Sequence, residues 1–285
     1  MNWSRTAILL AAAGASGLEA AGWDRIAAAL QLTGLPVEAS RGMMSEHELE
    51  EIEGLSPQEQ AERLLKRAAG NYGGALEQIE KRANGWTGKI ELNDTLNSLT
   101  SVAYCSTNLR VRAAAVEISL AGYGLPKTPE SVDAQMRLLE ENTEKKFFPL
   151  WKLGLLGNRG VEREKVLRVL VHYRGDPLEV NRLWAVNALG ILGTDEVIEP
   201  LIEVFRTDAS AEVRERAACN LADAGMLTRE QRRKAIPHLL RMTDEGGLDA
   251  QTRGWVYQAL REISGESMGA NPTAWRTWWD GQAAR

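Results

Sequence analysis

Few side chains in this sequence have the type and spacing that catalysis or metal binding requires. His47 is followed by Glu48, but Glu51 stands where the second histidine of a zinc-binding HExxH motif would be. His172 and His238 lie near the ends of expected helices, where a cation is favoured, so we expect structural or surface roles for them. No phosphate-binding glycine loop or nucleophile motif is present. The sequence therefore points away from an enzyme and predicts no metal and no cofactor.

The cysteines and the charge exclude further classes of protein. Cys105 and Cys219 have neither metal-site spacing nor a CxxC arrangement. The repeat described below separates them by three repeats, beyond the reach of a disulfide, so we expect no bond between them. The net charge is −5 and no basic stripe is visible, which disfavours a nucleic-acid partner.

Tryptophan is the unusual component, with nine Trp against five Tyr and three Phe. Large rigid aromatic side chains serve both protein cores and binding surfaces, so their positions decide between these roles. Those positions depend on the elements that carry them.

Apolar residues recur at helical spacing along almost the whole chain, and no alternating run of strand length is present. A basic residue is followed by an apolar residue three positions later, Leu at seven and a small residue at eleven. The pattern begins at Lys146, Arg182, Arg214 and Arg253, and a shifted copy begins at Arg112. These basic residues are 32 to 39 residues apart, a period that predicts stacked helix pairs. The first helices of the pairs, the A-helices, are expected over 92–104, 129–142, 163–174, 195–207 and 229–243, and a B-helix follows each.

The pairs Asp176 with Arg182, Asp208 with Val213-Arg214, and Asp249 with Arg253 resemble the HEAT repeat family, including its short bacterial, phycobilisome-lyase-type form. The resemblance covers roughly residues 92–266. It implies an all-α fold, a right-handed α-solenoid of stacked antiparallel helix pairs.

The same resemblance implies that the repeated arginines form hydrogen bonds between neighbouring repeats, with ligand contact as the alternative. These residues are Arg112, Arg182, Arg214 and Arg253. Two departures are that Pro149 lies inside a B-helix and that the Lys146 repeat lacks the aspartate.

Four segments are expected along the chain. Residues 1–22 resemble a signal peptide, which favours export (periplasmic or secreted) over a cytoplasmic location; the alternative is an Ala-rich first helix. Their apolar run is too short to span a bilayer, and no transmembrane segment is predicted. Residues 23–90 form a helical region that caps the solenoid, with a helix start at Ser56, Pro57 and Glu59. About five repeats follow over 91–266.

The last segment, 267–285, is a Trp-rich capping helix. Trp275, Trp278 and Trp279 share one helix face after Pro272. We expect them to cover the open flank of the final repeat.

A second group of aromatic residues lies on the B-helices. Counting each basic residue as position zero, the residues at +3, +4, +7 and +11 share the buried face, and those at +2 and +5 point the other way. This second set includes Phe148, Trp151, Trp184, Asn187, Arg216, Trp255 and Gln258. The resemblance implies that B-helices line a concave surface, where this stripe would bind a partner. The alternative is that the tryptophans fill the seam between neighbouring B-helices.

The sequence favours a non-enzymatic interaction or scaffold module that binds a protein or peptide along its concave face. The alternative is a HEAT-like enzyme or enzyme subunit, either phycobilin-lyase-like or similar to alkylpurine DNA glycosylases. The latter use Trp, Asp and Arg in their grooves.

Overall fold

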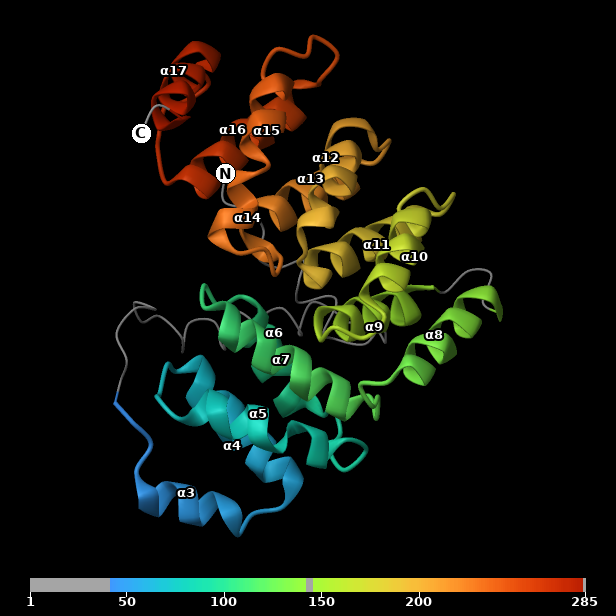
Figure 1. Cartoon of the computed structure of the whole chain (residues 1–285), viewed down its shortest axis with the longest axis vertical. Helices are drawn as coiled ribbons and strands as arrows, with labels where there is room; N and C mark the ends of the chain where they lie inside the picture. Colours follow the sequence, from blue (N-terminus) through green and yellow to red (C-terminus); the bar gives the residue numbers. More distant parts are fainter. Residues whose placement is uncertain (1–41, 142–145, 284–285) are drawn as a thin grey trace. The chain divides into compact units, whose positions relative to one another are not determined.

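A computed structural model describes residues 42–141 and 146–283 (Figure 1). The predictions for residues 1–22 and for the start of the 23–90 region lie outside these residues. The chain divides into two compact units, Met1–Ser131 and Val132–Arg285, and the division falls within the predicted repeat region. The described residues are helical and contain no strand, apart from an isolated bridge between Met43 and Gly73. The predicted all-α fold class is confirmed.

The described part of unit 1 stacks one helix pair on another. Its helices are α3 (Glu46–Glu53), α4 (Pro57–Ala69), α5 (Ala75–Trp86), α6 (Asp94–Tyr104) and α7 (Leu109–Gly122). Helix α4 lies beside α6, and α5 lies beside α7. The predicted helix start is confirmed, because the side chains and backbone amides of Ser56 and Glu59 form a reciprocal capping box with Pro57 in the first turn.

Unit 2 continues the alternation of A- and B-helices. Its elements are α8 (Pro129–Glu141), which begins at the end of unit 1, then α9 (Phe147–Asn158), α10 (Arg163–Tyr173), α11 (Glu179–Leu192), a 3₁₀ turn (Asp195–Val197), α12 (Ile198–Thr207), α13 (Ala211–Cys219), a π-helical turn (Asn220–Ala224), α14 (Arg229–Arg233), α15 (Ile236–Met242), α16 (Ala250–Ser264) and α17 (Pro272–Ala283). The B-helices α9, α11, α13 and α16 lie side by side in that order. Pro149 falls in the first turn of α9, where its missing N–H breaks no helical hydrogen bond.

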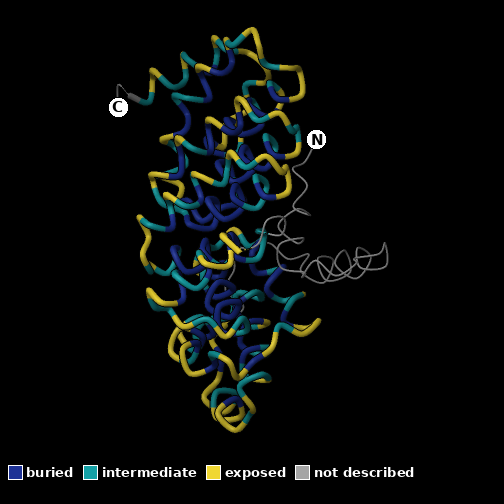
Figure 2. Tube along the Cα trace, turned by 90° about the vertical axis from the view of Figure 1, so that its right-hand side faces the viewer, coloured by how far each residue is buried: buried dark blue, intermediate teal, exposed yellow. Residues whose placement is uncertain are grey.

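The expected core face of the B-helices is buried. It includes Ala185, Val186, Leu189 and Leu192 of α11, together with Ala217, Ala218, Leu221 and Ala224 of the next B-helix. In α11 the burial also extends around the helix, since every residue from Ala185 to Leu192 is buried. Figure 2 shows such buried positions running through the helices of each unit. A helix buried on most sides must be flanked closely by its neighbours.

Glycine allows this close approach between B-helices. A Cβ atom added at Gly154 of α9 would lie 2.8 Å from the carbonyl oxygen of Ala188 in α11. At Gly190 of α11 it would lie 2.3 Å from Oδ1 of Asn220. Asn220 in turn donates a hydrogen bond to the carbonyl of Val186, at 3.1 Å. In α9 and α11, position +8 therefore packs against position +6 of the next B-helix, and only glycine leaves room at these two places.

The repeated arginines join neighbouring repeats in unit 2. Nε and Nη2 of Arg182 donate to both carboxylate oxygens of Asp208, at 2.8 and 3.0 Å. This hydrogen bonding is the main reason that the pKa of Arg182 is raised. Nη2 of Arg214 donates to Oδ2 of Asp249 at 3.0 Å. Each arginine also donates Nη1 to a carbonyl in the turn before its own helix, Asp176 for Arg182 and Asp208 for Arg214. Each of them therefore fixes two turns at once.

The other members of this series make different contacts. Lys146, the residue directly before α9, holds the equivalent place, with Nζ 3.7 Å from Asp176 Oδ2 of the following repeat. Arg253 donates to the carbonyls of Glu245 and Leu248 in the turn before its own helix. In unit 1, Nε of Arg112 donates to the carbonyl of Ser106.

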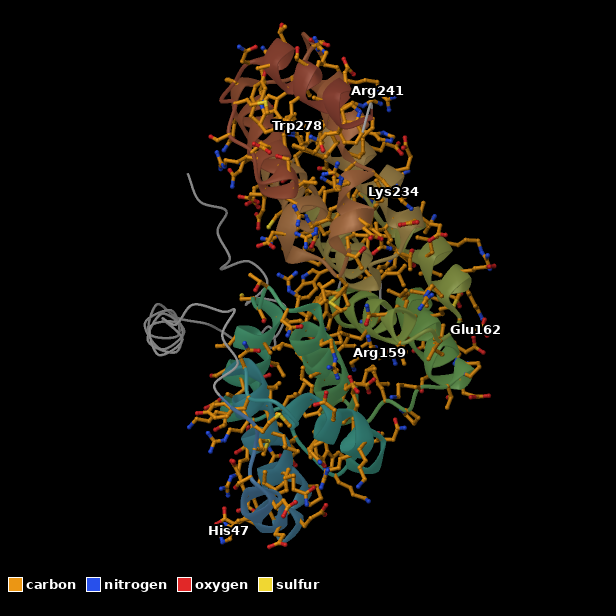
Figure 3. All side chains as sticks on the ribbon, turned by 60° about the vertical axis from the view of Figure 1, so that its left-hand side comes forward. His47, Arg159, Glu162, Lys234, Arg241 and Trp278 are labelled. Atoms are coloured by element: carbon orange, nitrogen blue, oxygen red, sulfur yellow. The ribbon has the colours of Figure 1, made fainter. Side chains whose placement is uncertain are left out.

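The final helix, α17, lies beside α15 and carries three tryptophans. Trp275 is buried, and its Nε1 donates to the carbonyl of Gly269 at 2.9 Å. Its ring meets that of Trp278 edge to face, with centroids 5.8 Å apart (Trp278 is labelled in Figure 3). The Trp279 ring lies 5.7 Å from the guanidinium carbon of Arg233 in α14. These contacts attach α17 to the end of unit 2.

Candidate functional site

The candidate site is formed by positions +2 and +5 of the four B-helices of unit 2, called here the B-helix face. It consists of Phe148, Trp151, Trp184, Asn187, Arg216, Cys219, Trp255 and Gln258. Rotation by about 100° per residue puts these positions opposite the core. The structure nevertheless buries most of them. The face is therefore a series of seams between B-helices, with open side chains only at some places.

The seam between α9 and α11 is aromatic. The rings of Trp151 and Trp184 meet edge to face with centroids 6.2 Å apart, and Phe147 lies 5.7 Å from Trp184. Trp151 is only 2% exposed, whereas Phe147, Phe148 and Trp184 are partly exposed. Position +5 of one B-helix thus meets position +2 of the next. The inner tryptophan fills the seam, and three outer rings remain accessible.

The seam between α11 and α13 is polar. The same register puts Asn187 opposite Arg216, which is 2% exposed. Within the described part of the chain, Nε and Nη1 of Arg216 have no hydrogen-bond partner. The nearest carboxylate contact is an ion pair of 3.9 Å between Nη2 and Glu215 Oε2. A buried guanidinium with so few partners is costly, because its donors have lost water without a replacement.

Cys219 lies one turn beyond Arg216 and is followed directly by the π-helical turn. Burial raises the pKa of its thiol to about 12; Arg216 acts in the opposite direction, and Glu215, Glu262 and Asp223 add to the increase. The thiol is therefore protonated at neutral pH and is a poor nucleophile. Neither Cys219 nor Cys105 forms a disulfide, as predicted.

The seam between α13 and α16 is mixed. Its register puts Cys219 opposite Trp255, and Trp255 and Gln258 are both buried. Nε2 of Gln258 donates to Oε1 of Glu262, at 3.0 Å. Trp255 therefore resembles Trp151 in filling space between repeats, as the packing alternative requires.

The histidines do not form a catalytic group with one another. Nδ1 of His47 lies 3.6 Å from an exposed Glu51 carboxylate, and the His172 ring packs on Tyr173. His238 lies in a groove of about 300 Å³ between α12 and α15, 3.3 Å from Glu199 Oε2 and 2.9 Å from Arg241 Nη2 (Arg241 is labelled in Figure 3). This groove is lined mainly by paired charges.

No cluster of three or more His, Cys, Asp or Glu side chains has the arrangement of a metal site in the described part of the chain. Among the helices of residues 42–141 and 146–283, none is both long and apolar enough to cross a membrane.

Comparison with known proteins agrees with the helix pairs described above. Residues 138–222, from the end of α8 to the π-helical turn, match the family model described as HEAT repeats. Among curated proteins, none matches the chain as a relative. The matched stretch contains the two Arg–Asp-linked B-helices and the aromatic and polar seams. Residues 138–222 therefore form HEAT repeats, and they carry the parts of the B-helix face on α9, α11 and α13.

Proposed function

We propose that the chain is a non-enzymatic protein-interaction module whose B-helix face binds an extended segment of a partner protein. HEAT repeats generally mediate protein interaction or scaffolding. The observation that carries the proposal is the group of partly exposed rings, Phe147, Phe148 and Trp184, supported from below by the buried Trp151. Rigid aromatic side chains on a firm base offer large contact area at a low entropy cost, as binding hot spots do.

The chemistry of the face supports binding rather than catalysis. Its most reactive group is the Cys219 thiol, which burial keeps protonated. The neighbouring amides of Asn187 and Gln258 bind by hydrogen bonding and do not act as nucleophiles.

The charge on and near the face supports a protein partner rather than nucleic acid. Glu215, Asp223 and Glu262 lie close enough to Cys219 to add to the increase in its pKa. A phosphate backbone carries one negative charge per nucleotide and would be repelled by these carboxylates.

The test compares two partly exposed tryptophans in different places. The full-length chain is used to capture partners from its native host, alongside Trp184→Ala on the B-helix face and the control Trp279→Ala on α17. A partner that binds the B-helix face is captured by the unaltered chain and by Trp279→Ala, and its capture falls about tenfold or more with Trp184→Ala.

Circular dichroism of each variant shows whether the fold is intact. Equal capture by folded Trp184→Ala and by the unaltered chain would overturn the proposal. Loss of capture with Trp279→Ala alone would move the binding site to α17.

A further inference from the structure

We infer that the polar seam between α11 and α13 selects a carboxylate, supplied by an Asp or Glu side chain within the partner's extended segment. This inference rests on the proposed function, because it names the chemistry that the B-helix face recognises. It concerns two residues at matching register positions, Asn187 and Arg216.

The first observation is the state of Arg216. The side chain is 2% exposed, yet Nε and Nη1 have no hydrogen-bond partner in the described part of the chain. Its ion pair with Glu215 is long, at 3.9 Å, so the charge is poorly compensated. Buried guanidinium groups are normally paired with a planar acceptor such as a carboxylate, to which they donate two parallel hydrogen bonds.

The second observation is the composition of the seam around this charge. At the equivalent place between α9 and α11, two tryptophans fill the space, whereas here the register brings together the amide of Asn187 and the guanidinium of Arg216. The side chain of Asn187 is buried at this place. The seam therefore presents amide and guanidinium donors where its neighbour presents rings.

The charge of Arg216 limits the ligand to a single negative charge. One carboxylate at Arg216 balances one guanidinium. A phosphate group, with nearly two negative charges at neutral pH, would exceed that single positive charge.

The positions on either side of the seam favour a side chain over a chain end. The B-helix face continues past Arg216 to Trp184 in α11 and to Trp255 in α16, so a bound segment can extend in both directions. Neighbouring helices are about 8–10 Å apart. A segment in the polyproline conformation advances about 9 Å in three residues, and every third side chain points in the same direction. Side chains three residues apart can therefore face two neighbouring B-helices. The expected motif is an acidic residue with an apolar residue three positions away, directed at Trp184.

The experiment is selection of random peptides displayed on phage against the immobilised full-length chain. Three forms are compared: the unaltered chain, Arg216→Gln, and the control Arg241→Gln on α15, outside the B-helix face. Peptides selected by the unaltered chain and by Arg241→Gln should share an acidic residue three positions from an apolar one. Peptides selected by Arg216→Gln should lose the acidic preference and keep the apolar one.

A synthetic copy of a selected peptide provides the affinity measurement. Replacing its acidic residue by the corresponding amide should weaken binding to the unaltered chain about tenfold, and leave binding to Arg216→Gln unchanged. Thermal unfolding of each variant shows that it is folded under the assay conditions.

The inference is overturned if selection yields no acidic preference, or yields the same preference with folded Arg216→Gln. In either case, the proposed function stands if Trp184→Ala still weakens binding of the partner. If Trp184→Ala has no effect on binding, the further inference and the proposed function are both overturned.

Discussion

Trp151 of α9 and Trp184 of α11 meet edge to face across neighbouring repeats, with ring centroids 6.2 Å apart. The first ring is buried and the second is partly exposed. The pair combines a packed ring with an accessible one, because the inner ring holds the outer one in place. Edge-to-face pairs of this kind add about 0.5–1.5 kcal/mol beyond the burial of their area.

The close approach of α9 and α11 predicts that replacing two different glycines by alanine has opposite effects on stability. Gly154→Ala should destabilise the chain by about 1–3 kcal/mol, because the new Cβ atom would lie 2.8 Å from the Ala188 carbonyl oxygen. The matched control is Gly254→Ala in α16, where no atom lies within 4 Å of the added carbon. Alanine there should stabilise the helix by about 0.5–1 kcal/mol. Urea unfolding measures both, and similar effects at the two sites would contradict the seam geometry.

The hydrogen bonds between Arg182 and Asp208 predict that replacing Asp208 lowers the free energy of unfolding more than replacing an exposed acidic residue does. Asp208→Ala should cost about 2–4 kcal/mol, since it removes two hydrogen bonds from Arg182 and leaves that partly buried guanidinium without a carboxylate. In the control, Glu245→Ala breaks a more exposed ion pair with Arg206 and should cost about 0–1 kcal/mol. In a double-mutant cycle, Asp208→Ala should cost much less unfolding free energy when Arg182 is already replaced by Met. Independent effects of the two substitutions would count against the link.

Arg216 is predicted to lower stability in the unbound chain. Arg216→Met keeps a similar length and removes a charge whose Nε and Nη1 lack partners in the described structure, so it should raise the free energy of unfolding by about 1–3 kcal/mol. Arg182→Met, which removes a well-bonded arginine, should lower it. Loss of stability with Arg216→Met would show that the guanidinium is already satisfied within the protein.

Cys219 predicts a pH effect in the alkaline range. The ordinary thiol pKa of 9.0 is raised to about 12 in the folded chain, so between these values the folded state holds a proton that the unfolded state has lost. The stability due to the protonated thiol is complete below pH 9 and is lost as pH rises toward 12. The difference in unfolding free energy between the unaltered chain and Cys219→Ala should therefore shrink over that range. A constant difference would indicate an ordinary thiol pKa.

The sequence was sufficient to predict the alternating helix pairs, the core face of the B-helices and the capping box at Ser56, but the A-helix expected over 229–243 is divided into α14 and α15. These features depend on local periodicity and on side chains three or four residues apart, which a single sequence displays directly. The pairing of Lys146, Arg182 and Arg214 with the next repeat's aspartate also follows from a regular period, since equivalent residues then stand at equivalent places.

The burial of positions such as Asn187 and Cys219 could not be predicted in the same way. Rotation about one helix gives the direction of a side chain but not the distance to the next helix. That distance is set by Gly154 and Gly190, where the backbones approach closely. The π-helical turn after Cys219 likewise lacks a signal in the sequence, because its residues, Asn-Leu-Ala-Asp-Ala, suit an ordinary helix.

The central claim is that a partner lies along the B-helix face, and site-specific photo-crosslinking tests it most directly. A photoreactive residue is placed at Phe148, which is partly exposed on this face, or at Arg241 on α15, and the chain is irradiated with its captured partner. The account predicts a partner crosslink from position 148 and none from position 241. A crosslink from position 241 with none from position 148 would contradict it.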